Sequence, residues 1–289
     1  MHSDRLADKQ QDEFYKSFWS APGEEYPDLH ILDGDSRNGL DILSLGCATG
    51  RDLWHLALDH HVCGMDISET GIAIAREHGI DAVVASVIDP FPYPDHSFDI
   101  IVAKDVLEHV LDPLAVMSEV RRVLRPEGHL VVLIPNQFYW WFRLRYLFGK
   151  SLIWKTFLHD QTSTFEEWNY IHVRFFTWKG VRRFLNASGF RITKHYFDFG
   201  CLEHYFAPDR YARMYRQNWE RGEKKSKRGI LVCYLIYSLW RFLNIIFPKR
   251  LRNRVVAWAP GLLTAAFYLR CQPAPTRSSS NRQKSWMRS

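Results

Sequence analysis

The sequence predicts an α/β protein with a parallel sheet whose two faces are both covered by helices. Between residues 41 and 135, short apolar runs alternate with amphipathic helical patterns, at the spacing typical of β-α-β units. A turn containing Gly46 and Gly50 follows the first apolar run, and Asp66 ends the second. Because such a turn exposes backbone N–H groups at the carboxyl edge of a sheet, we expect the ligand site there.

The individual elements follow from periodicity and from start and stop signals. The predicted strands cover residues 41–45, 61–66, 82–87, 98–103, 129–134, 190–199 and 262–271. The predicted helices cover residues 51–60, 68–78, 113–124 and 177–187. Ser68 and Thr177 are the expected N-caps, and Gly189 is expected to end the last of these helices.

Four regions are expected along the chain. Residues 1–39 form an N-terminal cap segment, and residues 40–199 form the core with an insertion at 137–175. Residues 200–272 form a C-terminal helical insertion and the last strand. The Ser/Arg-rich tail, 273–289, is expected to be disordered.

Composition favours a folded, soluble protein in a reducing compartment. Hydrophobic residues make up 46% of the 289 residues and charged residues 24%, which is ordinary for a globular chain. The five cysteines are scattered with no C-x-x-C pair, so neither a disulfide framework nor a metal site is expected. The first residues carry no secretory signal pattern. A cytoplasmic location is therefore the expectation.

The glycine turn distinguishes between cofactors. Asp66 stands twenty residues after Gly46, where a carboxylate can accept both ribose hydroxyls of an adenosine. A dinucleotide fingerprint beginning at Gly46 would need glycine at positions 48 and 51, where this chain has Ala48 and Arg51. A nicotinamide oxidoreductase is therefore disfavoured, while a tight turn without any ligand stays as the alternative.

Several motifs in order resemble one family. Residues 43–50 (LSLGCATG) resemble the first motif of class I S-adenosylmethionine (SAM)-dependent methyltransferases, usually written with glycine where this chain has Ala48. Residues 91–99, 106–110 and 125–130 are similar to later motifs of the ubiquinone-biosynthesis-like (methyltransferase type 11) group. The resemblance runs from about 41 to 135, and more weakly through 172–177. It implies a Rossmann-like, seven-stranded sheet with an antiparallel last strand, and SAM as the cofactor.

The resemblance also implies roles for individual residues. Gly46, Cys47 and Gly50 would lie against the amino-acid half of SAM, and Asp66 would bind the ribose with Ile67 beside the adenine. Ser86 and Val87 would border the adenine amino group, where the family often has aspartate at or near Ser86. Lys104 and Asp105, with Val106, would line the floor near the sulfonium.

The chemistry expected is transfer of a methyl group to an oxygen, with correct positioning as the enzyme's main task. His109 is the first candidate for a general base, and packing against or orienting SAM is its alternative role. His172, which precedes Arg174, is the second candidate, although a structural role is equally compatible. Asp105 and Glu108 could act as capping or cofactor-orienting carboxylates. No metal is required by this reaction.

Two aromatic-basic segments bear on the acceptor, and the first, residues 139–148, follows the fifth predicted strand. Residues 229–247 are apolar, are flanked by basic residues, and contain Arg241, so an in-plane helix at a membrane surface fits better than a span. Packing over the sheet as a lid or dimer face is the alternative. These features favour a small or lipid- or glycan-linked acceptor with peripheral membrane contact, and nucleic acid is not expected. A catalytically inactive methyltransferase-like binding module is the competing function.

Overall fold

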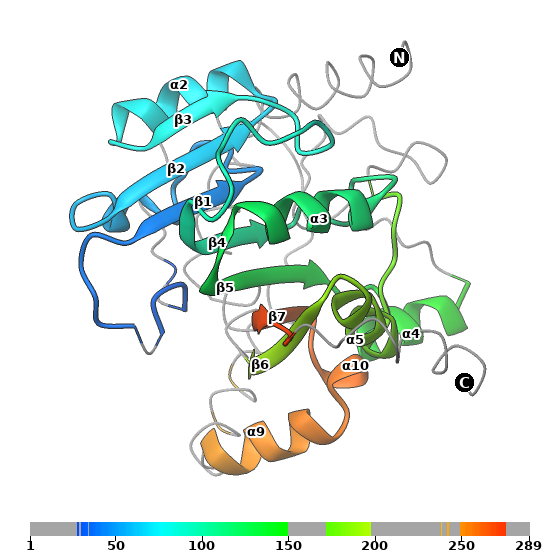
Figure 1. Ribbon diagram of the computed structural model, residues 1–289. Helices are drawn as coiled ribbons and strands as arrows, with labels where there is room; N and C mark the ends of the chain where they lie inside the picture. Colours follow the sequence, from blue (N-terminus) through cyan, green and yellow to red (C-terminus); the bar gives the residue numbers. More distant parts are fainter. Residues whose placement is uncertain are drawn as a thin grey trace, which may run out of the picture.

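The computed structural model describes residues 28, 30–33, 35–149, 172–197, 238, 242 and 249–275 (Figure 1). Several expectations therefore lie outside the described residues: nearly all of the apolar helix 229–247, most of the N-terminal cap segment, and the tail from residue 276. The domain boundaries drawn from the sequence stay predictions.

A single sheet of seven strands organises the described chain. Its strands are β1 Asp41–Leu45, β2 His61–Asp66, β3 Asp81–Val84, β4 Phe98–Lys104, β5 Leu124–Pro135, β6 Phe190–Tyr196 and β7 Ala266–Pro273. Their order is β3-β2-β1-β4-β5-β7-β6. The pairs from β3 to β5 are parallel, and β7 is antiparallel to both of its neighbours. The α/β sheet with an antiparallel last strand is thus confirmed.

The helices of the described residues include most of those expected. They are α2 Glu69–Glu77, α3 Pro113–Val123, α4 Trp140–Leu147, α5 Trp178–Ala187, α9 Lys249–Trp258 and α10 Pro260–Leu263, with a 3₁₀ turn η1 at Trp54–Leu56. Both predicted N-caps are confirmed, because Ser68 Oγ accepts from Gly71 N at 3.1 Å and Thr177 Oγ1 accepts from Gly180 N at 3.0 Å.

Several predicted boundaries are wrong, among them the start of the fifth strand, which was expected at 129 and lies at Leu124. The helix expected at 51–60 is reduced to η1, because Leu53, Leu56 and Ala57 each donate to the carbonyl three residues earlier. The last strand begins at Ala266 instead of 262, because Pro260 starts the short helix α10. The strand expected at 82–87 covers Asp81–Val84, and the chain turns where Asp89 N donates to the Ser86 carbonyl.

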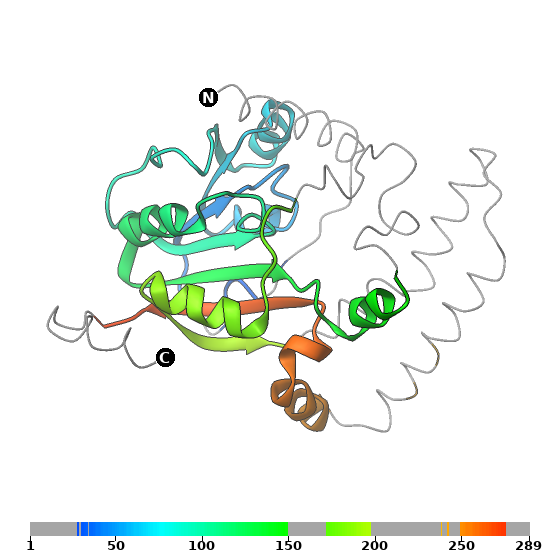
Figure 2. The same cartoon turned by 90° about the vertical axis from the view of Figure 1, so that its right-hand side faces the viewer.

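Helices and one irregular segment cover the two faces of the sheet. Strand residues such as Leu43 and Leu45 face α3 and α5 on one side, as the alternation of strand side chains requires. On the other side, Ile42 belongs to a core shared with η1, α2 and the fully buried Ile31. Figure 2 shows α4 and α10 beyond the carboxyl end of β5. The same end carries the predicted site.

Candidate active site

The turn between β1 and η1 has a backbone that requires its glycines. Gly46 and Gly50 have positive φ angles of 61° and 69°, and Ala48 has 46°. A Cβ on Gly46 would lie 2.6 Å from Val106 Cγ2, and one on Gly50 would lie 2.2 Å from Ile80 Cδ1. A side chain at either glycine would thus displace its neighbours as well as strain the backbone.

Asp66 ties this turn to the start of α2. Its carboxylate is 3% exposed, and Oδ2 accepts from Ala48 N at 2.8 Å while Oδ1 accepts from Ser68 N at 2.8 Å. These two bonds fix the carboxylate at the carboxyl end of β2.

The other residues assigned to the cofactor follow the same edge. Ile67 is half-buried after β2, and Ser86 and Val87 are half-buried after β3. Ala85 N donates to the Asp66 carbonyl at 2.9 Å, which keeps the β3 end beside the β2 end.

The backbone of Cys47 is part of the turn, while its side chain is buried in the hydrophobic core. The residue is 5% exposed, and a Cβ on Gly64 would lie only 2.7 Å from its Sγ. Burial raises the pKa of this thiol well above its usual range, and the Asp66 and Asp52 carboxylates raise it further. The Cys47 side chain is therefore a neutral core group.

Lys104, at the end of β4, lies in an ion-pair cluster that the sequence reading did not find. Its Nζ is 2.6 Å from Asp28 Oδ2 and 2.7 Å from Asp52 Oδ2, and the Tyr268 hydroxyl donates to Asp28. Burial alone would lower the lysine pKa, but the Asp52 and Asp28 carboxylates outweigh it and raise the pKa above its usual value. One positive and two negative charges leave the Lys104–Asp28–Asp52 cluster with a net charge of −1.

The loop after β4 brings the two predicted catalytic histidines together. The ring centroids of His109 and His172 are 4.7 Å apart, with an interplanar angle of 82°. The backbone carbonyl of Glu108 accepts from both Val173 N and Arg174 N, at 2.9 and 3.0 Å. These bonds hold the segment that carries His172 against the loop that carries His109.

Gln137, which was expected only as part of an insertion, contacts His172 of this pair. Its Nε2 donates to His172 Nδ1 at 2.9 Å. The contact depends on residues far apart in sequence, so no local pattern could indicate it.

Glu108 is an unusual carboxyl group beside the pair. It is 1% exposed, and within the described part of the chain neither of its carboxyl oxygens has a hydrogen-bond partner. Burial raises its pKa, and the neighbouring Asp105 raises it further. Asp105 itself has a positive φ of 52° and an exposed side chain. Ligand atoms of Glu108, His109 and His172 lie within 4.8 Å of one another, so this group has the composition of a cation site as well.

The sheet order and the glycine turn define the class I methyltransferase fold. A phosphoethanolamine N-methyltransferase 2 from Haemonchus contortus, solved with S-adenosyl-L-methionine, has the same fold, with a TM-score of 0.55 and 15% identity over 91% of this chain and 57% of that one. Residues 43–132 match the family described as methyltransferase domain. The chain therefore carries a domain of the class I, SAM-dependent methyltransferases.

Curated relatives agree on this class. A ubiquinone biosynthesis O-methyltransferase from Marinobacter nauticus is 28% identical over 42% of this chain. A phosphoethanolamine N-methyltransferase from Triticum aestivum is 32% identical over 41% of this chain. The matches span 58% and 25% of these relatives' own lengths. The chain thus matches less than two thirds of the length of either relative.

Proposed function

We propose that this protein is an active methyltransferase that binds SAM between the Gly46–Gly50 turn and Asp66. The observation that carries the proposal is the Asp66 carboxylate, fixed by two backbone N–H groups at the carboxyl end of β2. A carboxylate held this way is preorganised to accept ribose hydroxyls, and the glycines let a ligand approach the main chain closely.

The surrounding charge also suits SAM, which supplies a methyl group already activated by a sulfonium. The Lys104–Asp28–Asp52 cluster carries a net charge of −1 at the end of β4, where negative charge favours a cationic ligand. Lys104 thus helps to position Asp28 and Asp52, in place of contributing a free ammonium near the sulfonium. Holding the acceptor in line with the S–CH₃ bond can contribute roughly 7–11 kcal/mol to catalysis.

For the acceptor we propose an oxygen of a small or lipid- or glycan-linked molecule, with His109 as the general base. His109 lies on the loop that follows β4 at the carboxyl edge of the sheet, beside the Lys104 end of that strand, which favours it as the proton acceptor. His172 then positions His109 through their edge contact. One relative is named as an O-methyltransferase and the other as an N-methyltransferase. Their names therefore do not decide the acceptor atom, and the proposal of an oxygen acceptor depends on the histidine pair.

Peripheral membrane contact is a second part of the proposal. On α9, Leu251, Val255 and Trp258 are 44%, 52% and 85% exposed, at the spacing of one helix face. Arg250 and Arg254 on the same helix are exposed, as a helix lying on an anionic surface needs. No helix among the described residues is long and apolar enough to cross a bilayer.

Flotation with anionic liposomes tests membrane contact. The Trp258→Asp variant should no longer float with the liposomes, while the Leu58→Asp variant should float as wild type does. A wild-type protein that stays in the soluble fraction would contradict the proposal.

Titration calorimetry with SAM and S-adenosylhomocysteine tests the cofactor site. Wild type and the exposed control Asp59→Ala should bind, and Asp66→Ala should lose most of the affinity. Equal binding by wild type and Asp66→Ala would refute the assignment. Methyl-labelled SAM with a lipid and metabolite extract then tests activity, because binding without transfer into any fraction would favour the inactive module.

A further inference from the structure

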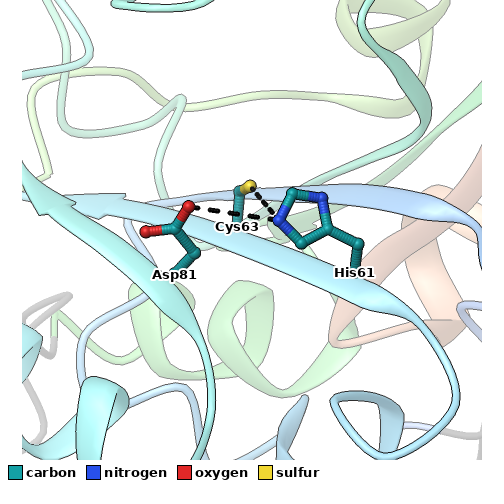
Figure 3. Close-up of side chains that lie close together, drawn as sticks. All are labelled: His61, Cys63 and Asp81. Carbon is teal, nitrogen blue, oxygen red and sulfur yellow. Dashed lines mark hydrogen bonds and ion pairs between the residues drawn. The ribbon is translucent and has the colours of Figure 1, made fainter.

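Three side chains of metal-binding chemistry meet at the edge of the sheet opposite the methyltransferase site. His61 and Cys63 are two residues apart on β2 and share a face, and Asp81 is the register partner of Cys63 on β3. The His61 Nε2 atom lies 3.8 Å from Cys63 Sγ and 4.0 Å from Asp81 Oδ2, as Figure 3 shows. All three ligand atoms lie within 4.8 Å of one another.

This geometry is close to that of a bound zinc ion. Ligand atoms of a tetrahedral Zn²⁺ site lie about 3.3–3.6 Å apart, given Zn–N, Zn–O and Zn–S distances of about 2.0–2.3 Å. The observed distances exceed these by a few tenths of an ångström or more. His61 and Asp81 have 58% and 72% exposed side chains, so both can move inward while the buried Cys63 stays in place.

Neighbouring groups already orient His61 as a ligand. Its Nδ1 is 3.1 Å from Asp41 Oδ1, and the other Asp41 oxygen accepts from Arg125 at 2.7 Å. With the Nδ1 proton donated to Asp41, the lone pair of Nε2 points at Cys63 and Asp81. This carboxylate–histidine arrangement is the one that supports metal ligands in proteins.

Tyr93 supplies an independent observation. Its hydroxyl is buried and has no hydrogen-bond partner among the described residues. Tyr93 packs against the hydrophobic cluster that contains Cys63, and burial raises its pKa, with Cys63 and Asp81 raising it further. A water bound to the cation would give this oxygen the partner that a buried polar group requires.

We propose that His61, Cys63 and Asp81 form a site for a divalent zinc-like cation, with water as the fourth ligand. The site joins β2 to the four-residue edge strand β3. His61 is the first residue of β2 and Asp66 is the last, so the two ends of the strand are about 16 Å apart at 3.3 Å per residue. The cation therefore stabilises the sheet edge and takes no part in methyl transfer. Binding releases the thiol proton of Cys63, since the thiolate is the ligand.

Cobalt(II) titration of the full chain, prepared free of metal, tests the site. Wild type should show a thiolate-to-cobalt charge-transfer band that saturates at one equivalent and disappears on adding Zn²⁺. Cys63→Ser should lose the band, and the conservative surface variant His61→Gln should weaken binding at least 10-fold. Cys271→Ser, another buried cysteine on β7, should keep the band.

Two further variants sharpen the outcome. Asp41→Asn should weaken Zn²⁺ binding about 10–100-fold while the band at saturation persists, as expected for a positioning residue. Glu108→Gln should leave the band unchanged. Absence of the band in wild type, its persistence in Cys63→Ser, or its loss in Glu108→Gln would each overturn the proposal.

Discussion

His109 and His172, predicted as alternative general bases, have different surroundings in the structure. Gln137 engages His172, and His109 lies edge-on against it. His109→Gln should therefore lower kcat about 10²–10⁴-fold, the usual contribution of a general base, with little change in SAM affinity. His172→Gln should have a smaller effect on kcat.

Steady-state kinetics over a range of pH, with calorimetry for SAM, check this prediction. The basic limb of the wild-type pH profile should be independent of His109, while the acidic limb, where the base becomes protonated, should be lost in His109→Gln. An unchanged acidic limb in this variant would assign proton transfer elsewhere. Exposed His78→Gln, on the far end of α2, is the matched control.

Single residues near the chain's glycine turn could be predicted because their spacing is local. Gly46, Gly50 and Asp66 fall within one β-α-β unit, and the structure brings them to one edge. The partners of Lys104 could not be predicted, since Asp28 is 76 residues away in sequence and Tyr268 joins it from β7. The cluster of His61, Cys63 and Asp81 likewise needs the β2–β3 register, which no local pattern supplies.

At the scale of elements, the turn after β1 contains a removable strain. Ala48 has a φ of 46°, a conformation that costs a non-glycine residue roughly 1–2 kcal/mol. Ala48→Gly relieves that strain, but it also raises the conformational entropy of the unfolded chain, which lowers stability. We expect a net stabilisation of about 0.5–1 kcal/mol in the free energy of unfolding.

Urea denaturation of Ala48→Gly beside Ala73→Gly measures this difference. Ala73 is exposed within α2, where glycine should destabilise by about 1 kcal/mol. A loss of stability in Ala48→Gly equal to that in Ala73→Gly would show that the turn carries no strain at this position.

Elements built from long buried runs were predicted to within a few residues, and those with short patterns were not. The strands β1, β2 and β4 are almost fully buried, so their apolar runs are unambiguous. Leu53 and Leu56 are three residues apart and both buried, which fits a 3₁₀ turn as well as an α-helix. The local sequence therefore could not distinguish them.

At the scale of the molecule, the buried His129 makes stability depend on pH. It is 2% exposed, with its Nε2 3.3 Å from the Ile31 carbonyl and Arg270 at its Nδ1. Burial, helped by Arg270, lowers its pKa to about 4. The pKa of His129 in the folded protein is below its unfolded value of about 6.5. The contribution of neutral His129 to the free energy of unfolding is therefore complete above pH 6.5 and is lost as the pH falls toward 4.

Between pH 7 and pH 5 this single group should reduce the free energy of unfolding by about 2 kcal/mol. Burial lowers the pKa of His195 in the same direction, so wild type should lose more than this. Denaturation curves at both pH values should show a smaller loss in His129→Gln. An identical pH dependence in the variant would mean that His129 stays neutral in both states or charges freely when folded.

The order of the strands in the sheet could be predicted from the sequence only in part. The alternating pattern predicted the parallel strands, and the family resemblance supplied the antiparallel last strand. Packing of residues 30–33 against β5, β6 and β7 could not be predicted, because it rests on contacts such as Lys194 with Asp33 and Arg270 with the Asp33 carbonyl. Those contacts exist only after the sheet has formed.

The position of β7 between β5 and β6 has a consequence for biosynthesis. On the ribosome, β5 and β6 are both made before Ala266 emerges, and each must wait with an unpaired hydrogen-bonding edge. Open strand edges invite association with other chains, and pairing over such separations is slow. A nascent chain of this protein is thus exposed to aggregation, and to chaperone capture, until its C-terminal strand fills the gap.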